Sequence, residues 1–394
     1  MQGRGRRVAI TGFGVATPCG IGKDAYWQGL LGPAITGTKN YQFTDWDPMP
    51  YYDSPKDARR ADKVEQFAIA SATEAFDHAG RPDVDPRRFG IIYGTGIGGL
   101  QTLEDQVEIR LEKGERRVSP FLVPMMMGNA SGAAISMRYG LQGPNETICT
   151  ACAAATHAIG NAARLIAWDR CDAMVTGGSE SAATPSAMAG FNNMTALSTV
   201  GASRPFDVGR DGFVMGEGAA AFILEAWDVA VGRGATIIGE VLGAASTADA
   251  HHITAPAPGG TGAIHCMHLA LEDAGLQPGD IRQINAHGTS TPLNDAAEAE
   301  AVTAVFGAEG PPITSTKGVT GHALGAAGAL EAAAVLLSMQ HRLIPPTAGT
   351  TQLSDDMHID LVMGDPRAWE PGPTISNNFG FGGHNGSVII APAS

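Results

Sequence analysis

Two stretches of small and apolar residues constrain the fold of this chain more than any other feature. Residues 151–167 read ACAAATHAIGNAARLIA, and residues 321–337 read GHALGAAGALEAAAVLL. A helix that is small or apolar on every side has no face for water, so both stretches are predicted to form buried central helices. Cys152 stands near the start of the first stretch and His322 near the start of the second. We infer two similar halves whose helix N-termini meet at one central site.

Strands and helices alternate along the chain, which predicts an α/β fold. Short apolar runs that lead into glycine, such as RRVAITGFGV and FGIIYGTG, are typical of buried strands. Residues 61–80 have apolar positions at helical spacing and end with Gly80, a common helix stop. The 394 residues exceed one ordinary core. We therefore predict an N-terminal half over residues 1–233, with the cysteine, and a C-terminal half over residues 234–394, with two candidate histidines.

Charge and cysteine content narrow the function classes. The 26 basic and 40 acidic residues give a formal net charge of −14, which argues against nucleic-acid binding. No run approaches the roughly 18 apolar residues of a membrane span, and the N-terminus lacks the apolar segment of a signal peptide. Five cysteines form no disulfide framework, so a reduced, cytoplasmic protein is expected. Cys149 and Cys152 have CxxC spacing, but no thioredoxin-like context supports a redox role.

Cys152 is the strongest candidate for a reacting group. A cysteine in the first turn of a helix faces the positive end of the helix dipole, which favours the thiolate over the thiol. Two histidines, His287 in INAHGTSTPLND and His322 in STKGVTGHALG, lie far downstream in glycine-containing turns. A cysteine protease or thioesterase is the alternative enzyme class. That class needs one histidine base and a group to orient it, and the chain has no matching nucleophile elbow.

Two other patterns resemble ligand sites. The glycines of residues 94–99 match GxGxxG after a predicted strand, but no second strand ending in an acidic residue completes a dinucleotide-binding unit. His265, Cys266 and His268 are too tightly spaced on one predicted helix to close a zinc site without distant ligands. We therefore predict neither a nucleotide cofactor nor a metal.

Five longer motifs run in order along the chain: TACAAATHAIGNAARLI, SRPFDVGRDGFVMGEGAAAFILE, NAHGTSTPLND, STKGVTGHALGAAGALE and NNFGFGGHNGS. With them the chain resembles an elongating, KAS II-like β-ketoacyl-acyl carrier protein synthase of the thiolase-like superfamily. The resemblance covers nearly the whole chain, from VAITGFGVATPCG to the C-terminus. It implies a layered αβαβα sandwich of two pseudo-duplicated halves, in agreement with the two buried helices.

The resemblance implies an acyltransferase that condenses carrier-bound substrates. Cys152 would take an acyl chain from acyl carrier protein, with the backbone N–H groups of Cys152 and Phe379 around the oxyanion. His287 and His322 would stabilise the enolate formed when malonyl-carrier loses CO₂, and a carbon–carbon bond would follow. The helix N-terminus would then be the main means of activating the sulfur. The family's lysine, glutamate and gating phenylalanine map onto Lys317, Glu331 and Phe379.

Binding positions follow from the same resemblance. Thr254 lies in the matching entrance loop, and Thr289 and Thr291 match residues that touch the phosphopantetheine arm. Leu103 and Phe191 match acyl-pocket positions, for which ordinary core packing is the competing interpretation. Because the substrates ride on acyl carrier protein, no separate cofactor is expected.

Docking and partners are less constrained. Arg59 and Arg60 fall where the family docks its acidic carrier, although the surrounding segment is shorter than in typical fatty-acid members. The roles of His251, His252 and His384 stay open, as does acyl chain length. Both primary fatty-acid elongation and a type II polyketide or polyene pathway use this scaffold. The partner subunit would be a second copy in the first case, or a chain-length factor in the second.

Overall fold

Two sets of five strands have the same spatial order in the computed structural model, which describes residues 5–393. The N-terminal set is ordered β5-β4-β6-β8-β1, and the C-terminal set β11-β10-β14-β15-β9. Numbered along the chain within each set, both orders read 3-2-4-5-1. The N-terminal strands are β1 (Val8–Thr17), β4 (Phe89–Gly94), β5 (Asn145–Ile148), β6 (Ala173–Glu180) and β8 (Gly218–Ala226). The C-terminal strands are β9 (Gly239–Ala248), β10 (Gln283–Asn285), β11 (Ile313–Thr314), β14 (Thr374–Gly380) and β15 (His384–Ala391).

Strand directions repeat between the halves as well. In the N-terminal set β4 runs parallel to β5 and β6, while β8 is antiparallel to β6 and β1. In the C-terminal set β10 runs parallel to β11 and β14, while β15 is antiparallel to β14 and β9. The halves join where β1 and β9 pair antiparallel over three residues, Val8–Ile10. The predicted duplication is therefore visible in the topology, and the predicted division at residues 233 and 234 falls between β8 and β9.

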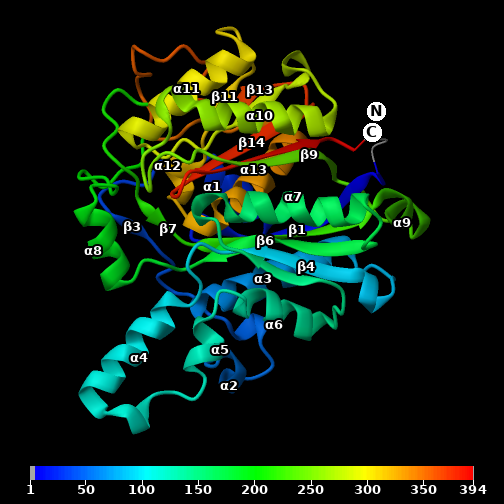
Figure 1. The fold of residues 1–394 in the computed structure, drawn as a ribbon, viewed down its shortest axis with the longest axis vertical. Coiled ribbons are helices and arrows are strands. Elements are labelled where there is room, and N and C mark those ends of the chain that lie inside the picture. The colour runs from blue at the N-terminus through cyan, green and yellow to red at the C-terminus, as the bar shows by residue number, and fades with distance from the viewer. Residues whose placement is uncertain (1–4, 394) are drawn as a thin grey trace.

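Helices form the other layers of the sandwich, which confirms the predicted αβαβα architecture (Figure 1). The central pair is α7 (Ala154–Ala167) and α13 (Ala327–His341), which contact each other and strands of both sets. Helix α3 (Lys63–Ala79) covers the outer face of the N-terminal strands, and α10 (Thr261–Ala274) covers that of the C-terminal strands. Helix α3 stops at Gly80, whose φ of 63° suits glycine, as the sequence predicted.

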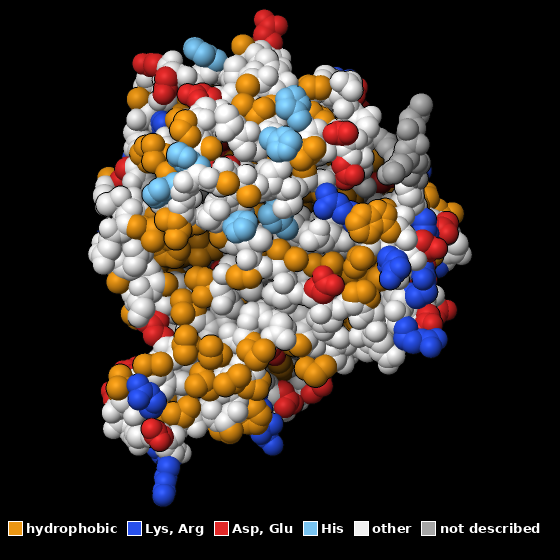
Figure 2. Space-filling model, in the orientation of Figure 1, with side chains coloured by type: hydrophobic (Ala, Val, Ile, Leu, Met, Phe, Trp, Pro, Cys, Tyr) orange, Lys and Arg blue, Asp and Glu red, His pale blue; other side chains and the backbone are white. Residues whose placement is uncertain are grey.

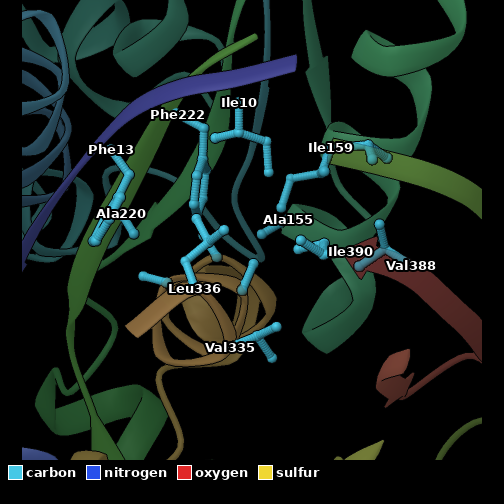
Figure 3. Packing of buried hydrophobic residues seen from close by; sticks show 14 of the residues in the cluster. Ile10, Phe13, Ala155, Ile159, Ala220, Phe222, Val335, Leu336, Val388 and Ile390 are labelled. Carbon is cyan, nitrogen blue, oxygen red and sulfur yellow. The ribbon is translucent and has the colours of Figure 1, made fainter. Parts of the chain in front are cut away.

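The core lies around the two central helices, where side chains from both halves meet (Figure 3). Val335 and Leu336 of α13 pack with Phe222 of β8 and Ile390 of β15. Small residues allow this close approach. A Cβ at Gly328 would stand 2.1 Å from the Thr156 hydroxyl oxygen, so glycine is required where α13 crosses α7.

The remaining elements connect this core and extend from it. Short strands are β2 (Gly20–Ile21), β3 (Asn40–Tyr41), β7 (Met215–Gly216), β12 (Leu343–Ile344) and β13 (Arg367–Ala368). Further helices are α1 (Lys23–Leu30), α2 (Pro55–Ala58), α4 (Leu100–Lys113), α5 (Leu122–Met126), α6 (Ala130–Tyr139), α8 (Pro185–Asn193), α9 (Trp227–Gly232), α11 (Pro292–Phe306) and α12 (Lys317–Thr320). Within residues 5–393, none of the helices has the length and apolar character needed to cross a membrane.

Candidate active site

Cys152 occupies a tight turn between β5 and α7. A single 3-10 turn, Ala151–Ala153, leads into α7 at Ala154 and carries the sulfur toward the C-terminal half. Ala151 has a φ of 49°, a left-handed conformation that costs a residue with a Cβ about 1–2 kcal/mol. Cys152 is only 5% exposed. The turn therefore presents the sulfur at the end of a central helix, as predicted, but in a buried setting.

Burial reverses the expected ionisation of that sulfur. Desolvation raises the pKa of the Cys152 thiol to about 12, against the lowering effects of Lys317 and of nearby backbone N–H groups. A helix dipole contributes at most about 2 kcal/mol, which corresponds to a pKa change of about 1.5. The dipole is therefore too weak to offset burial. The prediction that the thiolate is favoured, with the helix end as its main activator, is wrong for the substrate-free protein.

The two histidines lie beside the sulfur. His322 follows α12 and the turn at Gly321, and its Nε2 is 3.1 Å from Cys152 Sγ. His287 follows β10, and its ring stands edge-on to that of His322 with centroids 5.3 Å apart. Burial and the charge of Lys317 lower the pKa of both imidazoles well below the ordinary value. Both rings are therefore neutral near pH 7 and suited to donate hydrogen bonds from one nitrogen.

Lys317 and Glu331 form a buried ion pair behind His287. The Lys317 ammonium donates to Glu331 and to the backbone carbonyl of His287. Asn378 donates from Nδ2 to Glu331 Oε2 at 2.7 Å, and the same amide nitrogen lies 3.3 Å from His287 Nδ1. The Asn378 oxygen accepts from Thr156, which fixes the orientation of the amide. Because an amide nitrogen only donates, His287 carries its hydrogen on Nε2.

The tautomer of His322 follows from what its other nitrogen lacks. His322 Nδ1 is buried and has no hydrogen-bond partner among residues 5–393. A buried N–H without a partner is rarer than a buried lone pair without one. The hydrogen is therefore assigned to Nε2, which donates to Cys152 Sγ. His322 thus stabilises a developing thiolate and does not start as the base that removes the thiol proton.

Two buried carboxylates support these turns and were missed in the sequence. Glu298 in α11 accepts from the backbone N–H groups of His287 and Gly288, both at 2.7 Å, and burial raises its pKa to about 8. Glu180 at the end of β6 accepts from Gly96 at 2.6 Å and from Gly325 at 3.0 Å, and burial raises its pKa to about 7. In the sequence, only the glycine turns that these two glutamates bind gave a sign of this supporting role. The contact between Gly96 and Glu180 also explains the GxGxxG pattern, because the N–H groups of this glycine turn bind the Glu180 carboxyl group.

A cavity of about 520 Å³ leads to the sulfur and both imidazoles. The predicted entrance residues Thr254, Thr289 and Thr291 all line it. The hydroxyls of Thr289 and Thr291 lie 2.9 Å apart and form one polar edge. The structure therefore brings these three residues together with the catalytic candidates.

The glycine loop corrects one assignment. Phe379 still belongs to the β14–β15 ladder, where it pairs with Asn385, and its ring lies edge-on to His287 at 6.1 Å. Phe381 is the first residue beyond β14, and its backbone N–H faces Cys152 Sγ together with the N–H of Cys152 itself. The amide predicted for Phe379 thus belongs to Phe381. The two phenylalanines are two positions apart in one FGFGG motif, and only the end of the ladder tells them apart.

The acyl-pocket candidates separate. Phe191 in α8 stacks on Phe381 at 6.4 Å and lies edge-on to Phe213 at 5.9 Å, within the apolar cluster that contains Cys152. Leu103 in α4 is half-buried and does not line the cavity. Its pocket role therefore stays a prediction, since a single chain does not bring this residue to the cavity.

The surface candidates lie on two different regions. Arg59 and Arg60 are exposed after α2, and the Arg60 guanidinium stacks on Phe121 at 4.3 Å. Helix α2 lies at the opposite end of the long axis from α11, which carries the cavity edge (Figure 1). Histidines gather on the upper half of the face in Figure 2. Of the open cases, His252 accepts at Nδ1 from the backbone of Thr254, and so shapes the entrance loop.

The sulfur and imidazoles could in principle hold a metal. The ligand atoms of Cys152, His287 and His322 lie within 4.8 Å of one another, a donor set that zinc accepts. Histidines that bind metals almost always donate their second N–H to a carboxylate, carbonyl or water. His322 Nδ1 has no such partner in the described part of the chain. The residues therefore do not fit a resident zinc site.

Comparisons with known proteins agree on one family. The family model for the β-ketoacyl synthase N-terminal domain matches residues 32–230, and that for the C-terminal domain matches residues 238–351. The 3-oxoacyl-[acyl-carrier-protein] synthase 2 of Synechocystis sp. is 42% identical over 402 residues, 96% of each chain. The enzyme of that name from Vibrio harveyi is 40% identical over 98% of each chain.

Solved structures extend the likeness to the fold. The ishigamide ketosynthase/chain length factor matches with a TM-score of 0.92 at 31% identity, over 99% of this chain and 100% of that one. A ketosynthase in complex with its type II PKS acyl-carrier protein matches with a TM-score of 0.89 at 30% identity, over 99% and 100% of the two chains.

Proposed function

Because the chain belongs to the β-ketoacyl synthase family, we propose that it is a 3-oxoacyl-[acyl-carrier-protein] synthase, an acyltransferase that lengthens an acyl chain by decarboxylative condensation. The observation that carries the proposal is the buried contact between Cys152 Sγ and His322 Nε2, with His287 beside it at the end of the cavity. A nucleophile and two neutral hydrogen-bond donors suit a reaction in which a thioester and an enolate meet.

The first step transfers the acyl group. Cys152 Sγ attacks the thioester carbonyl of acyl-carrier protein, the carbon–sulfur bond to phosphopantetheine breaks, and the thiol proton passes to the leaving sulfur. The oxyanion accepts hydrogen bonds from the N–H groups of Cys152 and Phe381, which face the sulfur. One such donor is typically worth about 3 kcal/mol. His322 supports the sulfur as negative charge develops on it.

The second step forms the carbon–carbon bond. Malonyl-carrier loses CO₂, and the enolate oxygen accepts hydrogen bonds from Nε2–H of His287 and His322. The carbanion attacks the acyl carbonyl on Cys152, and the cysteine sulfur leaves as a thiolate that takes a proton from water. Neutral imidazoles suit this role, and the lowered pKa of both rings keeps them neutral. Lys317 holds the carbonyl of His287, and Glu331 holds the Asn378 amide that faces the ring.

Carrier recognition uses the cavity edge and a basic surface. Thr254, Thr289 and Thr291 contact the phosphopantetheine arm, and no separate cofactor takes part. Arg59 and Arg60 attract the acidic carrier, so Arg59→Glu/Arg60→Glu should raise the KM for acyl carrier protein and flatten its salt dependence. Arg170→Glu, an exposed arginine elsewhere, is the matched control. Equal effects of both changes would contradict the docking assignment.

A partner subunit is proposed to cover an apolar surface of α4, α5 and α6. Leu111, Val123 and Met137 on these helices are 70%, 59% and 77% exposed. Hydrophobic side chains gather across this lower region in Figure 2, and exposed apolar patches of this kind mark interaction sites. Strand β5 pairs on one side only, with β4. Leu103 on α4 would then reach an acyl pocket only in the assembled pair.

The partner's identity decides the pathway. A second copy would fit fatty-acid elongation, and a chain-length factor would fit type II polyketide or polyene synthesis. Purification from the native cell followed by mass spectrometry of the complex distinguishes the two. We place the enzyme in the cytoplasm, a proposal that the five unpaired cysteines support.

Mass spectrometry of the intact protein tests the reaction itself. Acyl-carrier protein should add an acyl group to wild-type protein and not to Cys152→Ala. Malonyl-carrier should then remove it as a lengthened 3-oxoacyl-carrier product. Failure of Cys152 to take an acyl group would exclude the condensing function. Release of free acid without a lengthened product would favour the thioesterase alternative.

A further inference from the structure

His157 is a buried histidine that none of the proposed steps uses. It lies in α7, five residues after Cys152, and is 6% exposed. Its Nδ1 is 2.8 Å from the Thr150 hydroxyl oxygen, and its Nε2 is 2.9 Å from the backbone carbonyl oxygen of Asn385. The ring therefore bridges the segment before the nucleophile and the segment after the glycine loop.

The two contacts determine the state of the ring. A carbonyl oxygen only accepts, so Nε2 carries the hydrogen and Nδ1 accepts from the Thr150 hydroxyl. Burial also lowers the pKa of His157, so the ring is neutral near pH 7. The fit on the β15 side is close, because a Cβ at Gly386 would stand 3.0 Å from the ring. A neutral, doubly bonded and closely packed imidazole holds its two partners at a defined distance.

Those partners lead directly to the two amides that face the sulfur. Thr150 precedes Cys152 by two residues, and Asn385 follows Phe381 by four. The two amides thus come from different halves of the molecule. The chain that joins Cys152 to Phe381 runs through the rest of the N-terminal half and most of the C-terminal half. A Cβ at Gly380 would stand 3.0 Å from the Cys152 nitrogen, so the two segments also lie close together at the backbone of Cys152.

We propose that His157 is a positioning residue that sets the spacing between the Cys152 and Phe381 amides through its bonds to Thr150 and Asn385. This inference rests on the proposed acyl transfer, in which both amides bind one oxyanion. Catalysis of this kind is sensitive to geometry, since a misplacement of about 1 Å can cost about 100-fold in rate. The competing interpretation is that His157 only packs α7 against β15.

Two reactions of the same cysteine separate these interpretations. Acyl transfer from acyl-carrier protein forms an oxyanion, whereas alkylation by iodoacetamide displaces iodide at a saturated carbon and forms none. His157→Leu should slow acyl transfer to Cys152 about 10- to 100-fold. Alkylation of Cys152 should fall less, by about threefold at most, because the displacement needs no oxyanion donor and the two amides affect it only through the thiolate population. His157→Gln, which can donate to Asn385 and accept from Thr150, should recover most of the loss.

Each result bears on the proposal. Acyl transfer at the wild-type rate in His157→Leu, or an equal fall of both rates, would overturn it. If His157→Leu does not fold, Thr150→Val decides: it removes one bond while keeping the side-chain shape. Thr150→Val should lower acyl transfer about three- to tenfold relative to alkylation, and an unchanged ratio would overturn the proposal. Wild-type protein is measured first, because its failure to acylate would reject the proposed function instead.

Discussion

The buried pair of Lys317 and Glu331 offers a test that separates stability from catalysis. Both side chains are almost fully buried, at 1% and 2% exposure. Lys317→Met keeps the length of the side chain but removes the ammonium, so that Glu331 keeps its hydrogen bond from the Asn378 amide but loses its cationic partner. Breaking a buried pair on one side costs about 3–5 kcal/mol, because the other charge stays buried without compensation.

The double variant Lys317→Met/Glu331→Gln supplies the comparison. It leaves no unpaired charge, so its loss of unfolding free energy should be smaller than the sum of the two single losses by about 2 kcal/mol or more. Urea unfolding at one fixed protein concentration measures all four proteins, since a subunit interface makes stability depend on concentration. A double loss equal to the sum would refute the coupling.

The pH dependence of the single variant gives a second check. Burial already raises the pKa of Glu331 while Lys317 opposes that effect. Without Lys317 the folded pKa rises further above its unfolded value, so the folded state holds the proton more tightly. Lys317→Met should therefore be most stable at low pH. Its free energy of unfolding should fall by up to about 1.4 kcal/mol per pH unit as the pH rises from the unfolded to the folded pKa of Glu331. A loss that does not depend on pH would refute the electrostatic explanation. Condensation that stays lost in the stable double variant would assign the Lys317–Glu331 pair a role beyond structure.

Three further predictions concern the histidines and the central helices. His322→Ala should slow acylation of Cys152 about 10- to 100-fold, because a hydrogen bond to a charged group is worth about 1.5–3 kcal/mol. His287→Ala should change the acylation rate less. Kinetics followed by intact-protein mass spectrometry would contradict this order if His287→Ala were the slower variant. The pKa of both His287 and His322 is lower in the folded state than the unfolded value of about 6.5. Their contribution to stability should therefore be complete above that pH and be lost as the pH falls below it. A urea midpoint that does not fall between pH 7 and pH 5.5 would count against buried neutral rings. Gly328→Ala should cost about 1–3 kcal/mol or more through overpacking, whereas Gly279→Ala, with nothing within 4 Å of its Cβ, should be near neutral in the same assay.

Several elements could be predicted because their signals are local. Helix α3 shows its spacing and its glycine stop within one segment, and both central helices reveal their burial through composition alone. The positions of Cys152, His287 and His322 followed from motifs that each occupy a few residues. The structure brings all three to one point, as predicted.

The errors share a different cause, since each depends on distant segments. The amide of Phe381 faces the sulfur because the β14–β15 ladder ends just before it, and ladder length is set by two strands together. The pocket role of Leu103 stays a prediction for the assembled pair, because a single chain does not bring this residue to the cavity. Glu298 and His157 were missed because their partners lie on other elements.

The amino-acid order by itself determined which groups can react and which helices must be buried, because side-chain chemistry and helical periodicity are properties of a short segment. Only the tertiary structure decided the ionisation of those groups and the identity of the amide beside them. Cys152 shows the difference: its helix N-terminus favours a thiolate, yet burial raises its pKa to about 12. Desolvation depends on everything that covers the sulfur, and that cover includes His322 and Leu324 from the C-terminal half of the chain.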